Sequence, residues 1–320
     1  MAINGVETAV FGVDDLPLCG RFLDDFGLAR AEESAGNIRY QLPEGSNVVL
    51  RRSDDPGLPP AFSSGPGLRE VIWGVDSTDT LNDIGNDLSR DRDITRDADG
   101  TLRSVDDMGL AIGFRVFKRK ELSAEDDLIN SPGRSVRWNK HRRWYDKAKP
   151  QLIHHVVFGY PDIQAPIKFY RDRLKFRITD IARDRGVFMR AQGRSDHHNI
   201  FWMKQEQPRF VHISFGVENI DELLAGANHM QRQGWKSKLG LGRHRISSTL
   251  YFYIESPTGG ECEYSADTDC LDDSWQPRIW EPLFGNQYWI AALPPFLETA
   301  PRADVKLLAD EDPELARIVR

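Results

Sequence analysis

Short apolar runs that end in an aromatic residue and glycine recur along the chain. "TAVFGVDDLPLCGRFLDDFGL" (8–28) aligns with "HVVFGYPDIQAPIKFYRDRLKF" (155–176), and "EVIWGVDSTDTLNDIGNDL" (70–88) aligns with "HISFGVENIDELLAGANHM" (212–230). Each stretch predicts a strand, a turn with acidic residues that caps a helix, and a helix with apolar residues three or four positions apart. The pattern therefore predicts four related strand–helix units. Two lie in the first half of the chain and are repeated in the second half.

Further strands are predicted after the helices. Residues 38–52, "IRYQLPEGSNVVLRR", have the pattern of a hairpin around "PEGSN". The runs at 109–117, 186–191 and 260–266 are apolar or alternating, and each is entered through glycine. The chain is therefore expected to have an α+β fold built from four tandem βαβββ modules.

The four modules predict two domains, which also suits a chain of 320 residues. We expect a first domain at 1–135 and a second at 150–285, joined by a connector near 135–150. Residues 286–320 are expected to form a C-terminal tail with less predictable structure.

Composition bears on the kind of partner and on the cellular location that are expected. The chain has 42 Lys and Arg against 49 Asp and Glu, a net charge of −7, so no nucleic-acid partner is expected. The basic run at 137–150 is local and is interpreted as a solvated connector. No apolar run is long enough to span a bilayer, and no signal peptide is visible. Three cysteines, an odd and sparse count, favour a reducing compartment, so a cytoplasmic location is expected.

One predicted strand carries an unexplained imidazole. In "QPRFVHISFGV" (207–217), alternation places two sets of side chains on opposite faces: Val211, Ile213, Phe215 and Val217 on one, and Phe210, His212, Ser214 and Gly216 on the other. The first set is apolar and is expected to pack in a core. Packing does not explain the histidine on the other face.

Comparison of the two halves suggests a reason for that histidine. Three positions of the second half carry metal-ligand side chains where the aligned positions of the first half do not: His155 against Thr8, His212 against Glu70, and Glu263 against Gly113. A lone strand histidine is more often structural than a ligand, but all three changes occur together in one half. Two histidines and one carboxylate leave coordination positions open on Fe(II) for a substrate and O₂. Zinc hydrolases use the same donor types, so these residues alone leave the metal undecided.

Several ordered motifs extend this pattern across the second half. They are the His-led strand and helix at 155–176, "DHHNIFW" at 196–202, the strand and helix from 212, and the loop and hairpin "LGLGRHRISSTLYFYIESPTGGECEY" at 239–264. With these motifs the chain resembles the type I extradiol (catechol) dioxygenases of the vicinal oxygen chelate superfamily. The resemblance implies two barrel-like domains of paired βαβββ modules, with metal ligands only in the second.

The resemblance also implies roles for individual residues. It assigns the iron ligands to His155, His212 and Glu263, with Fe(II) as the metal and Mn(II) as a second candidate. Within the pair at 154–155, His155 rather than His154 falls in the ligand register.

Three further residues match functional positions of the family. His198, rather than His197, matches its distal acid–base histidine, and His244 and Tyr253 match residues that hydrogen-bond the bound catechol. Ser247 stands where biphenyl-type relatives often have an acidic residue, which calls an acidic hydrogen-bond relay into question.

The implied activity is Fe(II)-dependent extradiol (meta) ring cleavage of a substituted catechol or trihydroxylated aromatic, with both atoms of O₂ incorporated. The partners are then a small aromatic diol and O₂, and a homo-oligomer with the first half as scaffold is expected. A non-oxidative metal lyase or isomerase is one alternative, and a non-catalytic ligand-sequestering protein is another. The three residues beyond the metal ligands argue against the former, and the retained ligand triad argues against the latter.

Overall fold

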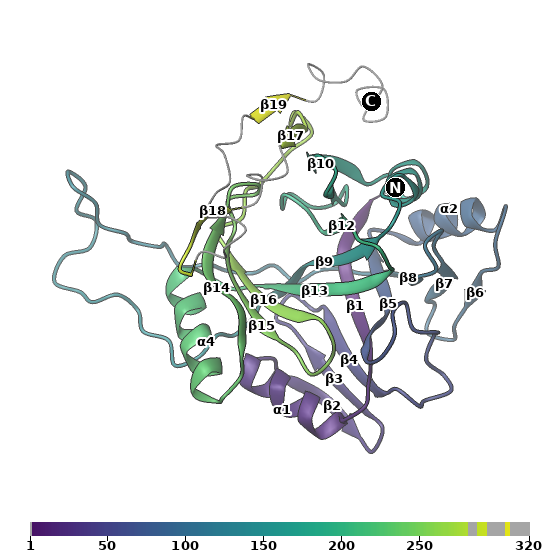
Figure 1. The fold of residues 1–320 in the computed structure, drawn as a ribbon, viewed down its shortest axis with the longest axis horizontal. Coiled ribbons are helices and arrows are strands. Elements are labelled where there is room, and N and C mark those ends of the chain that lie inside the picture. The colour runs from purple at the N-terminus through teal and green to yellow at the C-terminus, as the bar shows by residue number, and fades with distance from the viewer. Residues whose placement is uncertain (1, 281–286, 293–304, 308–320) are drawn as a thin grey trace.

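The computed structural model describes residues 2–280, 287–292 and 305–307. Two large sheets with helices against them make up the molecule (Figure 1). In the described residues, the first sheet has the strand order β2-β3-β4-β1-β5-β8-β7-β6. Its strands are β1 (Ile3–Val13), β2 (Arg30–Ser34), β3 (Asn37–Gln41), β4 (Asn47–Arg52), β5 (Gly67–Val75), β6 (Thr95–Arg96), β7 (Leu102–Val105) and β8 (Ala111–Val116).

The second sheet has the order β18-β14-β15-β16-β13-β9-β12-β11-β10-β17-β19 over the described part of the chain. Its strands are β9 (Leu152–Tyr160), β10 (Arg177–Ala182), β11 (Gly186–Arg190), β12 (Ile200–Lys204), β13 (Arg209–Gly216), β14 (Ser237–His244), β15 (Leu250–Glu255), β16 (Glu261–Ala266), β17 (Arg278–Trp280), β18 (Gln287–Ile290) and β19 (Val305–Leu307). Most of the predicted tail at 286–320 lies outside the described residues.

The element order confirms the predicted α+β fold of four βαβββ modules. The modules begin at β1, β5, β9 and β13, and each first strand pairs in parallel with the last strand of its own module. A parallel pair needs a crossover, which the helix and the intervening strands supply. The first strands of neighbouring modules then pair antiparallel, β1 with β5 and β9 with β13, and so join two modules into each sheet.

The helices lie where the apolar spacing predicts them: α1 (Leu16–Phe26), α2 (Thr78–Leu88), α3 (Gln164–Ile167) continuing into a wider turn η1 (Lys168–Arg173), and α4 (Ile220–Arg232). The turns that cap α2 and α4 contain acidic residues as predicted, but the capping side chains within them are not acidic. The side chains of Ser77 and Asn219 accept the backbone N–H groups there, because short hydroxyl and amide side chains reach the N3 position readily. Acidic residues occupy the first turn instead, where the helix dipole favours them.

The two halves share one hydrophobic core. Phe26 of α1 stacks on Tyr264 of β16 with ring centroids 4.0 Å apart, and the Tyr264 hydroxyl donates to the Phe26 carbonyl at 2.8 Å. Phe11 of β1 meets Phe210 of β13 edge to face. The first half therefore packs directly behind the strands of the second half that carry the predicted ligands.

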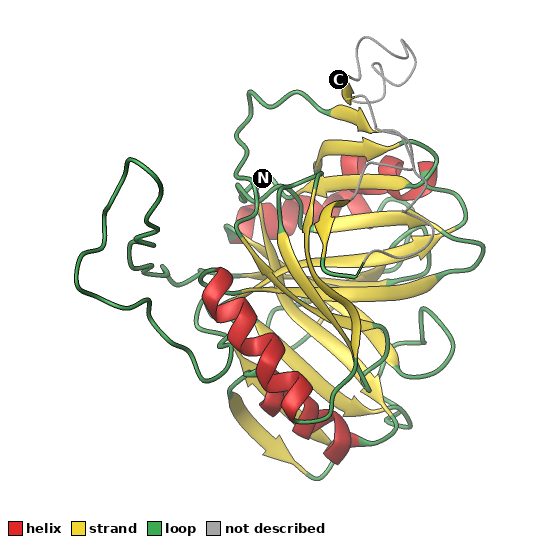
Figure 2. Cartoon of the chain, turned by 60° about the vertical axis from the view of Figure 1, so that its left-hand side comes forward, coloured by secondary structure: helices red, strands yellow, loops and turns green. Residues whose placement is uncertain are grey.

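A long connector joins the halves between β8 and β9. It is extended, apart from an isolated bridge between Ser131 and Arg134, and it projects from the body as a loop (Figure 2). We call residues 118–149 the linker arm. Among the described residues, no helix combines the length and apolar character that crossing a membrane would require.

Candidate active site

Strand register brings the predicted metal ligands together. In β13, Ser214 lies opposite His155 of β9 on one side and opposite Glu263 of β16 on the other. Residues opposite one another in a sheet point to the same face, and so does a residue two positions along the strand. His155, His212 and Glu263 consequently share one face, although 108 residues separate the first from the last.

The donor atoms of these three residues converge. His155 Nε2 lies 3.2 Å from His212 Nε2 and 3.2 Å from a carboxylate oxygen of Glu263, and His212 Nε2 lies 3.6 Å from that oxygen. All three side chains are buried, and neither Glu263 oxygen has a hydrogen-bond partner of acceptable geometry among the described residues. A buried, unpaired carboxylate facing two imidazoles fits a divalent cation, which would satisfy all three donors.

The electrostatics keep these donors in the protonation states that bind metal. Burial lowers the pKa of His212 to about 3 and also lowers the pKa of His155, so both rings are neutral at pH 7. Burial by itself would raise the pKa of Glu263, but His155 and His212 beside it hold that pKa below its usual range. Neutral imidazoles and an ionised carboxylate are the forms that ligate metals.

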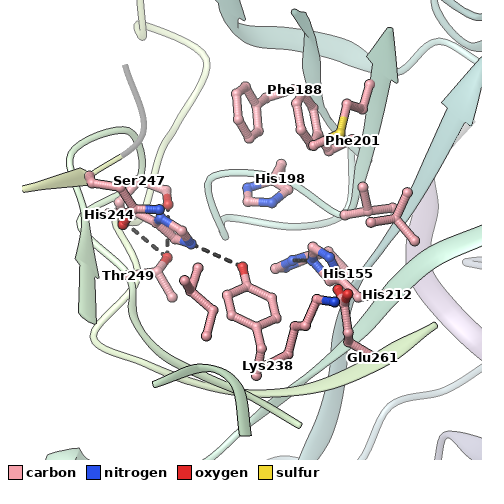
Figure 3. A pocket seen from close by; sticks show the side chains of 16 residues that line it. His155, Phe188, His198, Phe201, His212, Lys238, His244, Ser247, Thr249 and Glu261 are labelled. Atoms are coloured by element: carbon pink, nitrogen blue, oxygen red, sulfur yellow. Dashed lines mark hydrogen bonds between the residues drawn. The ribbon is translucent and has the colours of Figure 1, made fainter. Parts of the chain in front are cut away.

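A cavity of about 420 Å³ opens over this group. His155 and His212 line it, and Figure 3 shows them with His198 and His244 around the space. Tyr253 also lines the cavity, so the six predicted site residues gather in one place, with Glu263 buried beneath its floor. Much of the remaining wall is apolar: Val157, Phe188, Phe201, Met203, Val211 and Leu239.

Several known proteins are similar to this chain. Residues 152–264 match the Glyoxalase/Bleomycin resistance protein/Dioxygenase superfamily. Metapyrocatechase 2 of Cupriavidus necator is 34% identical over 278 residues, covering 84% of this chain and 83% of that relative. The chain belongs to the extradiol dioxygenases of this superfamily. The predicted family is thereby confirmed.

Two other similarities are informative. The Iron-dependent extradiol dioxygenase of Rhodococcus jostii (strain RHA1) is 30% identical over 160 residues, which is 45% of this chain and 53% of that relative. A solved structure, the Mn(II)-bound glyoxalase from Novosphingobium aromaticivorans, has a TM-score of 0.72 at 20% identity and covers 95% of this chain and 96% of its own. At that identity the likeness concerns the fold, and it agrees with the expected fold of the superfamily.

In this extradiol dioxygenase, His244 and Tyr253 form one polar wall. The His244 ring nitrogen Nε2 lies 3.0 Å from the Tyr253 hydroxyl. Burial raises the pKa of Tyr253 well above its usual value, and the nearby Glu263 raises it further, so the phenol keeps its proton. Ser247 also lines the cavity, and its hydroxyl pairs with Thr249 at 2.8 Å, so a neutral hydroxyl pair occupies this position.

His198 lies over the His155 ring, with ring centroids 4.1 Å apart. The ring of Phe188 packs edge to face with the His198 ring, with ring centroids 5.0 Å apart. Burial lowers the pKa of His198 well below its usual value, and the neighbouring histidines lower it further. The ring is therefore neutral at pH 7 and has one unprotonated nitrogen.

His154 and His197, the members of the two His-His pairs that were not expected in the site, both have partners behind it. His154 Nδ1 lies 3.1 Å from His155 Nδ1, and His154 Nε2 lies 3.6 Å from Asp196. In superfamily sites of this kind, an outer partner of a ligating histidine fixes its ring orientation. The signal in the sequence was the His-His dipeptide itself.

The second dipeptide repeats this arrangement. His197 Nδ1 lies 3.1 Å from His198 Nδ1, and its Nε2 lies 3.2 Å from Asp180, which also accepts from Trp280 Nε1 at 2.9 Å. Asp180 carried no signal in the sequence, because only the pairing of β10 with β17 brings Trp280 and the carboxylate together.

One expectation about strand β13 is wrong. Simple alternation placed Phe210 and His212 on one face, but the register shifts between these residues where β13 pairs with β9. A bulge adds one residue to the strand and reverses the facing of the side chains beyond it. Phe210 therefore packs in the core with Phe158, whereas Val211 and His212 both line the cavity.

Proposed function

We propose that this protein catalyses extradiol (meta) ring cleavage of a substituted catechol or trihydroxylated aromatic, with both atoms of O₂ incorporated into a ring-opened product. The observation that carries the proposal is the convergence of His155, His212 and Glu263 on the floor of a mainly apolar cavity that also contains proton-handling side chains. Fe(II) is the metal that this function calls for, and Mn(II) suits the same donors.

The three ligands divide the work of holding the ion. Glu263 supplies the negative charge, and the two neutral imidazoles supply donors without adding charge. When bound, Fe(II) allows triplet O₂ to react with a singlet catechol and keeps coordination positions open for both. The three ligand side chains are themselves buried, so protein surrounds the ion on the side of its ligands.

Tyr253 and His244 are assigned to the bound diol. The protonated phenol of Tyr253 donates a hydrogen bond to a substrate oxygen that has lost its proton, and His244 holds the phenol at 3.0 Å. Such a donor, fixed in advance, stabilises a developing oxyanion more strongly inside a buried site than in water.

His198 is assigned as the acid–base group. Its neutral ring accepts a proton from the reacting groups and returns one as the ring opens. The hydrogen bond to His197 fixes which ring nitrogen faces the cavity. Stacked Phe188 and Phe201, 4.0 Å between centroids, offer the flat apolar surface that an aromatic ring requires.

The test is anaerobic reconstitution of the protein with Fe(II), Mn(II) or Zn(II), followed by a panel of one-ring, two-ring and trihydroxylated catechols and then O₂. We expect O₂ uptake and a yellow ring-opened product only with Fe(II) or Mn(II). Failure of every diol with either metal, together with activity of the Zn(II) form on a non-oxidative substrate, would overturn the proposal in favour of a lyase or isomerase.

We also propose that residues 150–285 form the catalytic domain, residues 1–135 a scaffold domain and residues 286–320 a tail, in a cytoplasmic homo-oligomer. The converging ligands within 155–263 and the shared aromatic core support the division of labour. Three free cysteines, two of them buried, support a reducing compartment.

A further inference from the structure

The linker arm exposes apolar side chains to an unusual degree. Every residue from 120 to 135 is exposed. Ten large hydrophobic residues are exposed among the described residues, and the arm holds half of them: Leu122, Leu128, Ile129, Trp138 and Trp144. Trp138 and Trp144 are 71% and 83% accessible, whereas tryptophan is among the side chains that gain most from burial.

The arm nevertheless has a defined shape. The Asn130 side chain accepts from the backbone N–H groups of Val136 and Arg137 at 2.9 and 2.8 Å, and donates to the Arg137 carbonyl at 3.0 Å. At its two roots, Arg119 binds Glu44 of the first half and the Lys149 N–H donates to Glu222 of the second. Ordering a residue costs about 1–2 kcal/mol, and burial within the chain does not offset that cost here.

Charge is divided along the arm. Its outgoing part, 121–127, carries four acidic residues and no basic one, and its returning part, 134–143, carries five basic residues and no acidic one. Within the arm, Arg142 pairs with Asp127, and Arg143 lies 3.8 Å from Glu125. The remaining charges, on Glu121, Asp126, Arg134, Arg137 and Lys140, make no ion pair within the described residues. The arm therefore presents two complementary surfaces side by side.

We propose that the linker arm is a self-association element, which pairs with the same arm of a second copy of this chain across a two-fold axis. In such a contact each patch meets its complement twice, so the acidic part of one arm lies on the basic part of the other. The exposed Trp138, Trp144 and Ile129 are buried between the arms. Of the 32 residues of the arm 25 are exposed, which is within the roughly 20–30 residues per side of a stable interface.

This contact gives the proposed homo-oligomer a defined surface, but it is independent of the chemistry. No arm residue lines the active-site cavity. Variants of the arm should therefore change the oligomeric state and leave metal content and turnover of the separated chains intact, so that failure of this proposal and failure of the catalytic one give different results.

The test is sedimentation velocity on the full chain over a range of concentrations. The triple variant Arg134→Glu, Arg137→Glu, Lys140→Glu places like charges together and should raise the dimer dissociation constant by about 100-fold or more. The triple variant Glu121→Lys, Glu125→Lys, Asp126→Lys should do the same. Combined in one chain, the six changes exchange the two patches and should restore association to within about tenfold of the wild type.

Tryptophan variants test the apolar part of the contact. Trp138→Ser should weaken association by about 30-fold, as loss of a buried interface tryptophan does. Val105→Ser, which removes an exposed apolar side chain outside the arm, is the control and should leave the dimer dissociation constant unchanged. A wild-type chain that stays monomeric, or an oligomer that none of the arm variants weakens, would overturn the proposal.

Discussion

The two halves of the molecule have the same strand pairing, but they differ in what neutralises their buried carboxylates. Thr8 of β1 and Gly113 of β8 both lie opposite Ile72 of β5, just as His155 and Glu263 both lie opposite Ser214. The strand register thus confirms the alignment of the two halves on which the ligand prediction depended. A metal site is therefore a property of side chains at these positions and not of the fold.

In the first half, arginines of the chain itself take the place of a metal. Buried Glu70 pairs with Arg103, and buried Glu7 pairs with Arg115 at 3.3 Å. A Cβ atom at Gly113 would lie 3.1 Å from Ile72 and 3.4 Å from Glu70, so a ligand side chain does not fit there without movement. Both halves bury carboxylates in this region, but Glu70 has an arginine partner and Glu263 has none among the described residues.

The largest effect should come from substituting residues at aligned positions of the two halves. His212→Ala removes one of three donors, so we expect loss of bound metal and a large fall in turnover. Loss of an outer-shell partner of a metal ligand lowers activity by up to about 100-fold, and the loss of a ligand itself should exceed that. Glu70→Ala at the aligned position should retain metal and turnover and lose about 1–3 kcal/mol of unfolding free energy, because Arg103 keeps Asp97 but loses its buried carboxylate partner. Metal analysis and denaturant unfolding of both variants decide this, and full metal occupancy in His212→Ala would contradict it.

A second comparison separates chemistry from metal binding. His198→Phe should keep its iron but lose about 10²–10³-fold in turnover, or roughly 3–4 kcal/mol of transition-state stabilisation. Ser46 is the control. It precedes Asn47 in the first half as His198 precedes Asn199 in the second, and Ser46→Ala should leave turnover unchanged. Single-turnover kinetics at matched iron content measure this, and near wild-type turnover in His198→Phe would remove its acid–base role.

Removing the metal should affect one half only. Chelation leaves Glu263 buried without a cation, and we expect a loss of about 3–4 kcal/mol of unfolding free energy relative to the metal-saturated protein. Hydrogen exchange should increase in β9, β13 and β16 and stay unchanged in β1, β5 and β8. Equal changes in both halves would show that the metal stabilises the whole core and not its own site.

The smallest effect concerns the central residue between the ligands. The Ser214 hydroxyl is buried and has no hydrogen-bond partner in the part of the chain that the structure describes, so Ser214→Ala should leave metal binding intact and raise the unfolding free energy by about 1 kcal/mol. Ile72→Val at the aligned position removes a buried methylene and should lower it by about the same amount. If Ser214→Ala instead weakens metal retention, the hydroxyl has a role at the site.

Local patterns predicted much of this molecule. The helices α1, α2 and α4 follow from apolar spacing, and the β3–β4 hairpin follows from its turn residues. The bulge at Phe210 and the role of Asp180 did not follow, because both depend on a neighbouring strand and not on the residues nearby in the chain. The exposed arm was recognised as a connector, but its organisation by Asn130 appears only in three dimensions.

The sequence by itself determined which side chains are available at each repeat position, because strand alternation and helix spacing are local and the repeat makes the halves comparable. It also determined that one half carries two histidines and a carboxylate where the other does not. Tertiary structure alone decided that these donors lie within 4.8 Å of one another and beneath a cavity. The physical reason is that such distances depend on the register between strands, which hydrogen bonds and core packing set jointly across residues far apart in the chain.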